Sequence, residues 1–206
     1  MLQRITVWDV PTRVFHWLQV LSFGAAYWIS DSERMRNYHV ALGYILLGLL
    51  VFRLLWGFIG SRYARFSSFV FSPRQIIQYL MSMVKRNPVH YLGHNPAGSV
   101  SVWLLLGLGL FVCITGVLAL QDDASDLVID MHDWSTDVML VIIALHLFGV
   151  ALSSFLHREN LVRAMVTGFK AAEPEAGIRH SYSWLGVLML AAVVIFWFVY
   201  LKKPLG

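Results

Sequence analysis

The chain is poor in charged residues and in cysteine. Only 14% of its 206 residues are charged, and Cys113 is the only cysteine. One cysteine excludes a disulfide within the chain, and the absence of a Cys-x-x-Cys-His motif excludes a cofactor attached through cysteines. So little charge is unusual for a soluble domain of this length, and we expect no nucleic-acid partner.

Hydrophobic residues make up 58% of the chain, and its mean hydropathy is +0.64. Apolar runs long enough to cross a bilayer recur along the sequence, and they are too long for the strands of a barrel. The sequence therefore predicts an all-α membrane protein. Its five predicted spans lie at about residues 14–30, 38–59, 99–120, 128–155 and 183–201.

Two longer polar segments separate some of these spans. Segment 60–97 is basic, and Pro73 can open a helix with an apolar stripe, which we expect to lie flat at the membrane surface. Segment 156–182 carries a short predicted helix around Asn160–Lys170, followed by a linker. We therefore divide the chain into a membrane domain at 1–170 and a linker with a C-terminal transmembrane helix at 171–206.

Basic residues indicate the orientation, because loops on the inner side of a membrane carry an excess of lysine and arginine. The predicted spans place one set of basic residues on the N-terminal side and a smaller set on the other. The first set is Arg4, Arg13, Arg62, Arg65, Arg74, Lys85, Arg86, Arg158, Arg163, Lys170 and Arg179, and the second is Arg34, Arg36, Lys202 and Lys203. The N-terminus is therefore predicted to be cytoplasmic, with the two late lysines as a mild violation.

His132 and His146 lie fourteen residues apart within one apolar run. Fourteen residues are almost four helical turns, so both imidazoles fall on one helix face, about 21 Å apart along the axis. A membrane core is about 30 Å thick. One helix therefore offers a histidine near each side of the bilayer, facing the same way.

Two further histidines supply partners at matching depths. His16 lies at the inner end of the first span and His39 at the outer end of the second. A histidine near a helix end is often only an interfacial hydrogen-bonding residue, but four that form two depth-matched pairs favour metal ligation. We predict two haems of the b type, with axial pairs His16–His146 (inner) and His39–His132 (outer).

Small and basic residues accompany these histidines. Gly43, Gly109, Gly116 and Gly149 can leave room for a flat porphyrin, although close helix packing explains them equally well. Arg53 in the second span and Arg13 before His16 are candidate partners for haem propionates, and plain topology signalling is the competing interpretation.

His90 and His94 are spaced four residues apart, as metal ligands on a helix would be. Gly93, Asn95 and Pro96 indicate instead a turn that precedes the third span. We therefore interpret these two histidines as loop residues.

Several stretches resemble the bacterial cytochrome b561 and Ni,Fe-hydrogenase b-type cytochrome family. The resemblance covers residues 5–170 and is carried by VWDVPTRVFHW at 7–17, FRLLWGFIGSRYARF at 52–66, GHNPAG at 93–98, the His132…His146 pair, HRENL at 157–161 and AMVTG at 164–168. It implies a four-helix core that holds two b haems through histidines of the first, second and fourth helices. The fifth span is a departure from the shortest members.

The resemblance also implies an activity. We expect a di-haem cytochrome of the bacterial inner membrane, an electron-transfer subunit of a respiratory chain. It would carry electrons between the quinone pool and a periplasmic c-type cytochrome or hydrogenase-like protein. The alternative is a quinone oxidoreductase that acts directly on a small outer donor such as superoxide. Such an enzyme needs a positive outer funnel to steer the anion, whereas Gln121–Asp130 is acidic.

Overall fold

The computed structural model describes residues 2–202, so Lys203, part of the predicted topology, lies outside the described residues. Helices form over all five predicted spans, with edges shifted by at most four residues. The elements are β1 Gln3–Thr6, α1 Val10–Trp28, α2 Arg36–Ile59, α3 Pro73–Val84, α4 Pro96–Leu118, α5 Asp126–His157, α6 Leu161–Thr167, β2 Phe169–Ala172 and α7 Ser183–Leu201, with 3-10 turns at Glu33–Met35, Phe66–Ser68 and Pro174–Ala176.

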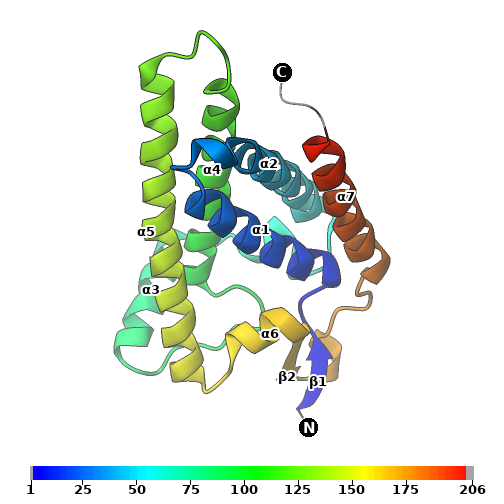
Figure 1. The fold of residues 1–206 in the computed structure, drawn as a ribbon. Helices are drawn as coiled ribbons and strands as arrows, with labels where there is room; N and C mark the ends of the chain where they lie inside the picture. The colour runs from blue at the N-terminus through cyan, green and yellow to red at the C-terminus, as the bar shows by residue number, and fades with distance from the viewer. Residues whose placement is uncertain (1, 203–206) are drawn as a thin grey trace.

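The five long helices run up and down in one bundle (Figure 1). Helix α5 packs chiefly against α4, while α1, α2 and α7 pack against one another and α2 also packs against α4. One end of the bundle carries β1, β2 and α6, and we call it the sheet end. The other carries the connections at residues 29–35 and 119–125, and we call it the acidic end because five aspartates and glutamates lie on or beside these connections: Asp31, Glu33, Asp122, Asp123 and Asp126.

Polar caps fix where several helices begin. The side chain of Asp9 accepts a hydrogen bond from Thr12 N at 2.7 Å at the start of α1, and Asn95 accepts from Gly98 N at 2.7 Å at the start of α4. Ser72 and Gln75 form a reciprocal capping box on α3. Such caps satisfy backbone donors that the first helical turn leaves free.

Four helices in the described range are long and apolar enough to cross a membrane: Glu33–Ile59, Pro96–Leu118, Asp126–His157 and Ser183–Leu201. Helix α1 has the length of α7 but is not among them, because Arg13, His16 and Gln19 lower its hydropathy. It nevertheless packs against both α2 and α7. The structure thus shows a membrane helical bundle, and the number of spans stays a prediction.

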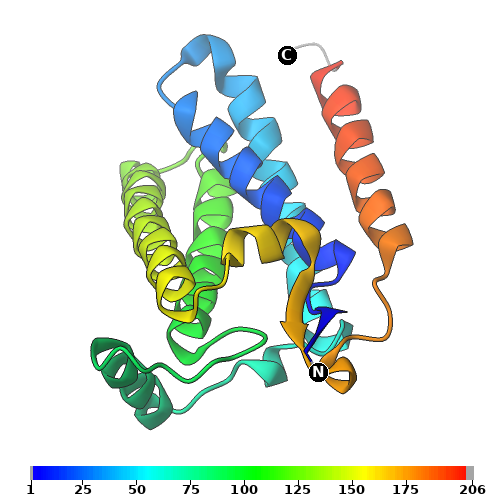
Figure 2. The same ribbon diagram turned by 90° about the horizontal axis from the view of Figure 1, so that it is seen from below.

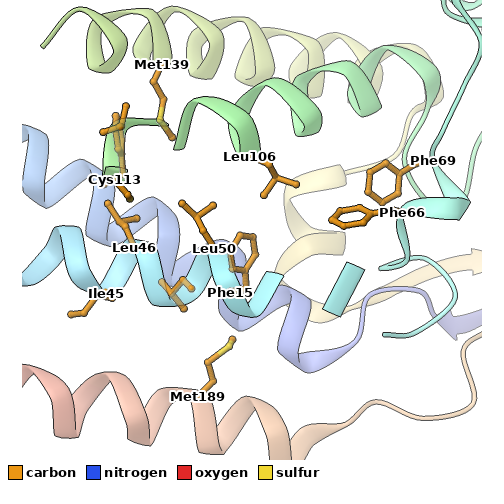
Figure 3. Packing of buried hydrophobic residues seen from close by; sticks show 13 residues of the cluster. Phe15, Ile45, Leu46, Leu50, Phe66, Phe69, Leu106, Cys113, Met139 and Met189 are labelled. Carbon is orange, nitrogen blue, oxygen red and sulfur yellow. The ribbon is translucent and has the colours of Figure 1, made fainter. Parts of the chain in front are cut away.

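The main core is formed where the long helices pack together (Figure 3). Its buried side chains come from α1, α2, α4, α5 and α7, with Phe66 and Phe69 from the segment after α2. Met139 of α5 is 3% exposed and stands seven residues from both His132 and His146. Seven residues rise about 10 Å, so Met139 places an apolar layer between the two depths.

The sheet end departs from the all-helical expectation. Strand β1 pairs antiparallel with β2, with Gln3 opposite Ala172 and Thr6 opposite Phe169, and a small second core with buried Val7 and Trp8 lies beneath. Figure 2, seen from below, shows the two paired strands and α6 at this end of the bundle. Gly168 ends α6 at φ +85°, where its amide bonds Ala164 O; glycine suits this left-handed position.

Helix α3 lies beside α4 at the same end. It buries Tyr79 but exposes the apolar stripe Ile77, Leu80, Met81 and Val84. The predicted helix after Pro73 is therefore confirmed, and its placement flat on a membrane surface stays a prediction.

Candidate functional site

His39 and His132 face each other near the acidic end. His39 lies in the first turns of α2 and His132 in the second turn of α5. Their ring centres are 6.2 Å apart and their planes are nearly perpendicular, at 81°. The structure thus brings together the two residues of the predicted outer pair from helices that are distant in sequence.

Backbone carbonyls orient both rings. His39 Nδ1 lies 2.9 Å from Ala26 O of α1, and His132 Nδ1 lies 3.0 Å from Val112 O of α4. A carbonyl oxygen only accepts hydrogen bonds, so each Nδ1 carries the proton and donates it. Each Nε2 therefore keeps a lone pair, which is the arrangement found in histidines that bind a metal.

The spacing of the rings fits axial ligation of one iron. A metal–imidazole bond is about 2 Å long, and the bonded nitrogen lies about 1.1 Å from the ring centre, so two axial imidazoles that share a metal have centres about 6 Å apart. The observed 6.2 Å agrees with this value. The donor set, two imidazoles without a thiolate, also suits a bis-histidine haem.

A cavity surrounds this pair. Its volume is about 660 Å³, within the range of roughly 300 to 1,000 Å³ typical of cofactor and ligand sites. Gly43 lines it, and a Cβ at Gly43 would meet no atom within 4 Å. A Cβ at Gly116 would lie only 2.9 Å from His132 Cε1. Both positions thus keep space beside the imidazoles, whereas Gly109 packs against Leu50 and serves helix contact.

His16 of α1 and His146 of α5 lie nearer the sheet end. They are close enough to influence each other electrostatically. His16 Nδ1 is shielded from solvent and has no hydrogen-bond partner within residues 2–202. A Cβ at Gly149, three residues after His146, would meet open space. The structure thus puts both predicted inner ligands toward the sheet end, one of them with an unsatisfied nitrogen, and their ligation of a shared iron stays a prediction.

Comparison with known proteins identifies the group to which this chain is related. Residues 7–168 match the family model described as prokaryotic cytochrome b561. The chain belongs to this family.

Its relatives include probable Ni/Fe-hydrogenase B-type cytochrome subunits. The one from Azotobacter chroococcum is 25% identical over 81% of this chain and 88% of its own length. The one from Rhizobium leguminosarum is 24% identical over 81% and 88%, and that from Escherichia coli K12 is 23% identical over 80% and 90%. No solved structure matched the chain. A b-type cytochrome of this family is a membrane protein that carries haem b and transfers electrons.

The two candidate arginines lie at the sheet end of this cytochrome. Arg53 is 3% exposed, and its guanidinium stacks over Phe66 at 5.1 Å and Phe69 at 5.8 Å. Its Nη1 is buried and unpaired in the part of the chain that the structure describes. Arg13 donates from Nη1 to Val166 O at 2.6 Å. Each arginine thus keeps one buried nitrogen without a partner in the described residues, Nη1 of Arg53 and Nε of Arg13, and Arg13 also ties α1 to α6.

Asp9 is a site-shaping residue that the sequence interpretation did not single out. Its carboxylate is fully buried and accepts hydrogen bonds from Thr12 N, Trp56 Nε1 at 3.1 Å and the Ser61 hydroxyl. It therefore clamps the start of α1 to the end of α2, beside Arg53. An aspartate two residues before Pro11 is a cap signal that could have indicated part of this role.

The loop before α4 and the segment after α5 meet at the sheet end. His90 Nε2 and Lys170 Nζ each lie 3.1 Å from the same Glu159 oxygen, and the His90 and His157 rings are 5.2 Å apart. Burial tends to raise the pKa of Glu159, but the bonds from His90 and Lys170 outweigh it and lower this pKa. No cluster of three metal-binding side chains occurs among the described residues.

His94 lies deeper than His90. Its ring packs 4.9 Å from Trp8 and 4.4 Å from Phe69. Burial, and then the charge of Arg53, lower the pKa of His94 to about 3. Asn95 and Pro96 directly after it open α4, so the predicted turn before the third span is confirmed.

Proposed function

We propose that this cytochrome is a transmembrane conduit that carries electrons through two b haems, one held by His39 and His132 and the other by His16 and His146. The observation that carries the proposal is the facing of His39 and His132 at the spacing of two axial ligands. The whole membrane unit, residues 1–170, would form the conduit, and the C-terminal helix would be an added fifth span.

The residues around the pairs support electron transfer rather than oxygen chemistry. Two axial imidazoles leave a haem iron no open position, so the group supplies outer-sphere, one-electron exchange. The chain's own part is to hold the imidazoles and exclude water. The Nδ1 bonds to Ala26 O and Val112 O fix the ring orientation, and Met139 with Leu50 seals the space between the two depths. Arg53 would pair with a propionate at the sheet end.

Charge sets the proposed orientation. The sheet end carries the excess of arginine and lysine, and the acidic end carries most of the carboxylates. By the positive-inside tendency the sheet end faces the cytoplasm of a bacterial cell and the acidic end faces the periplasm. A quinone would then exchange electrons at the sheet end, while a periplasmic redox protein would dock at the acidic end.

The relatives suggest the kind of partner. They are named as cytochrome subunits of Ni/Fe-hydrogenases, so a hydrogenase-like donor at the acidic end is the first candidate. A c-type cytochrome is the second, because a carboxylate-rich surface complements a basic protein. Asp31, Glu33, Asp133 and Asp137 all line the cavity around His39 and His132.

These same carboxylates argue against the alternative of direct superoxide oxidation. An anionic substrate would be repelled by them, with Arg36 as the basic side chain that lines the cavity in the described range. Stopped-flow mixing of the oxidised protein with superoxide tests this alternative. Haem reduction close to the diffusion limit would favour it over our proposal.

Paired alanine variants test the conduit. We expect purified wild-type protein to contain two b haems, His39→Ala and His132→Ala to lose the same one, and His16→Ala and His146→Ala to lose the other. Redox titration followed by visible spectroscopy tells the two apart by midpoint potential. His180→Ala, at an exposed position near the start of α7, is the control and should keep both. Loss of different haems within one pair would refute the assignment.

A further inference from the structure

Three hydrogen-bonded polar side chains lead inward from the sheet-end surface. His90 is 45% exposed, Glu159 is 22% exposed and Lys170 is 2% exposed, and both basic groups contact one Glu159 oxygen. The three residues come from the loop before α4, the segment after α5 and strand β2. This hydrogen-bonded series, which we call the sheet-end triad, therefore connects water with the interior.

The ammonium group of Lys170 is buried, which is unusual for a lysine. Along β2 burial alternates, so that Lys170 and Ala172 face inward while Phe169 and Ala171 face outward. Lysine is almost never fully buried unless it is paired. Its hydrogen bond to Glu159 is the one contact of this kind that the described chain gives it, and an ammonium has three donors. The buried end of the triad thus retains donor capacity.

His94 lies within electrostatic reach of Lys170, with no hydrogen bond between their side chains among the described residues. Its ring stands against Trp8, which belongs to the small core beneath the sheet, and against Phe69, which also lies under Arg53. Its Nδ1 is buried and has no partner among residues 2–202. The charged or titratable groups that act on it are Arg53, His146, Lys170 and His16. His94 is therefore within electrostatic reach of both the triad and the predicted inner ligands.

The protonation states of His94 and Glu159 suit the transfer of a proton through this series. His94 is neutral at physiological pH because its pKa lies near 3. A neutral imidazole offers one N–H donor and one acceptor at the same time. Glu159 is ionised because its pKa is lowered, and His90 gives it a partly exposed neighbour from which a proton can arrive. A structural ion pair alone would not need an unpaired imidazole beyond it.

We propose that the sheet-end triad and His94 form a proton inlet for quinone reduction at the inner haem site. This inference rests on the proposed function. A benzoquinone that becomes a quinol takes up two electrons and two protons. The electrons come from the acidic-end donor through the two histidine pairs, and the protons come from sheet-end water through His90, Glu159, Lys170 and His94 to the two quinone oxygens.

The test uses the full-length holoprotein with its haems reduced by dithionite and then mixed with decylubiquinone in a stopped-flow instrument. Haem reoxidation is followed in the visible spectrum, and proton uptake is followed with a pH-indicator dye in weak buffer. For Glu159→Gln we expect both signals to slow by about tenfold or more, most strongly at alkaline pH, because a missing acid–base group in a transfer step costs at least this much. Reduction by dithionite should keep its wild-type rate.

Matched variants separate a relay from a structural ion pair. Glu159→Asp keeps a carboxylate and should restore most of the rate. Glu173→Gln removes an exposed carboxylate at the same end of the molecule and should behave as wild type. If Glu159→Gln fails to fold, His90→Gln at the exposed end of the triad replaces it, with His180→Gln as its control, and imidazole in solution should rescue the His90 variant.

The outcomes distinguish this inference from the function on which it rests. If quinone does not reoxidise the reduced wild-type protein, the proposed function fails and the inlet fails with it. If the wild type is reoxidised and folded Glu159→Gln keeps the wild-type rate and proton uptake at every pH, the inlet alone is refuted. A slowing of equal size at every pH that Glu159→Asp does not relieve would also refute it, since that is the result expected of a structural ion pair.

Discussion

Gly116 gives the sharpest test of the acidic-end site. A Cβ at this position would stand 2.9 Å from His132 Cε1, whereas an ordinary van der Waals contact begins at 3.4 Å. In Gly116→Ala the imidazole must therefore retreat by about half an ångström. The ring is not free to do so without loss, because Nδ1 is held by Val112 O at 3.0 Å, which belongs to the same helix as Gly116.

The cost of this substitution can be estimated from overpacking, which destabilises a tight site by about 1 to 3 kcal/mol. If the cost falls on the bound state, haem affinity at His39–His132 should fall by roughly five- to 150-fold, since 1.4 kcal/mol is about tenfold. We expect haem content to drop toward one per protein, or the midpoint potential of that haem to shift while the other keeps its value. Quantitative haem extraction and a redox titration measure both quantities.

Gly107→Ala is the control on the same helix, because a Cβ there would meet nothing within 4 Å. Both variants gain the same helix propensity and the same methyl group. They differ only in the neighbour that the methyl meets. If Gly116→Ala retains two haems with unchanged potentials, then His132 is not fixed as an axial ligand in the geometry described, and the proposed outer pair loses its main support.

Three further outcomes follow from buried charge. Asp9→Ala removes a cap and leaves Trp56 Nε1 and the Ser61 hydroxyl unpaired, which should cost on the order of 3 kcal/mol and lower the Tm by several degrees, as thermal loss of the haem spectrum will show. Arg53→Met removes a positive charge; a unit charge about 10 Å from a redox centre, at an effective dielectric constant of about 20, is worth about 1.7 kcal/mol, so the midpoint potential of the proposed sheet-end haem should fall by tens of millivolts in a redox titration. Because the pKa of Glu159 is lowered in the folded protein, its ion pairs add stability at pH values above its ordinary pKa of 4.5, and this stability is lost as the pH falls through the lowered pKa. Glu159→Gln should therefore make the Tm depend less on pH in the acid range.

Hydrophobic runs predicted the helices, and histidine spacing predicted that His39 and His132 lie close together, as their rings do; their ligation of haem stays a prediction. The His132–His146 spacing depends only on helix periodicity, and the depth of His39 follows from its place at a helix end. Four of the predicted spans are also recognised by length and hydropathy in the structure. Helix α1 is the exception, because polar residues such as Arg13 and His16 make it too hydrophilic to be recognised alone.

The two strands of the sheet end could not be predicted from the sequence in this way. Strands of four residues are too short to give a periodic signal, and β1 and β2 are separated by most of the chain. Lys170 was counted only as a basic residue on the N-terminal side, because its burial depends on this long-range pairing. The roles of the glycines also differ in the structure: Gly116 leaves room for an imidazole and Gly109 packs on a leucine, a difference that sequence spacing does not reveal.

The two histidine pairs differ in the charges that surround them, and this difference bears on the direction of electron flow. At the acidic end both Nδ1 atoms donate to carbonyls, and aspartates line the cavity. Both features stabilise the oxidised, more positive state of a metal and lower its potential. At the sheet end His16 Nδ1 has no such bond within the described chain, and Arg53, although Asp9 lies near it, adds a buried positive charge whose Nη1 has no hydrogen-bond partner there. We infer that the sheet-end haem has the higher midpoint potential. Electrons delivered at the acidic end would then move downhill toward the side where His94 and the sheet-end triad would supply protons. A redox titration that assigns the higher potential to the His39–His132 haem would contradict this direction.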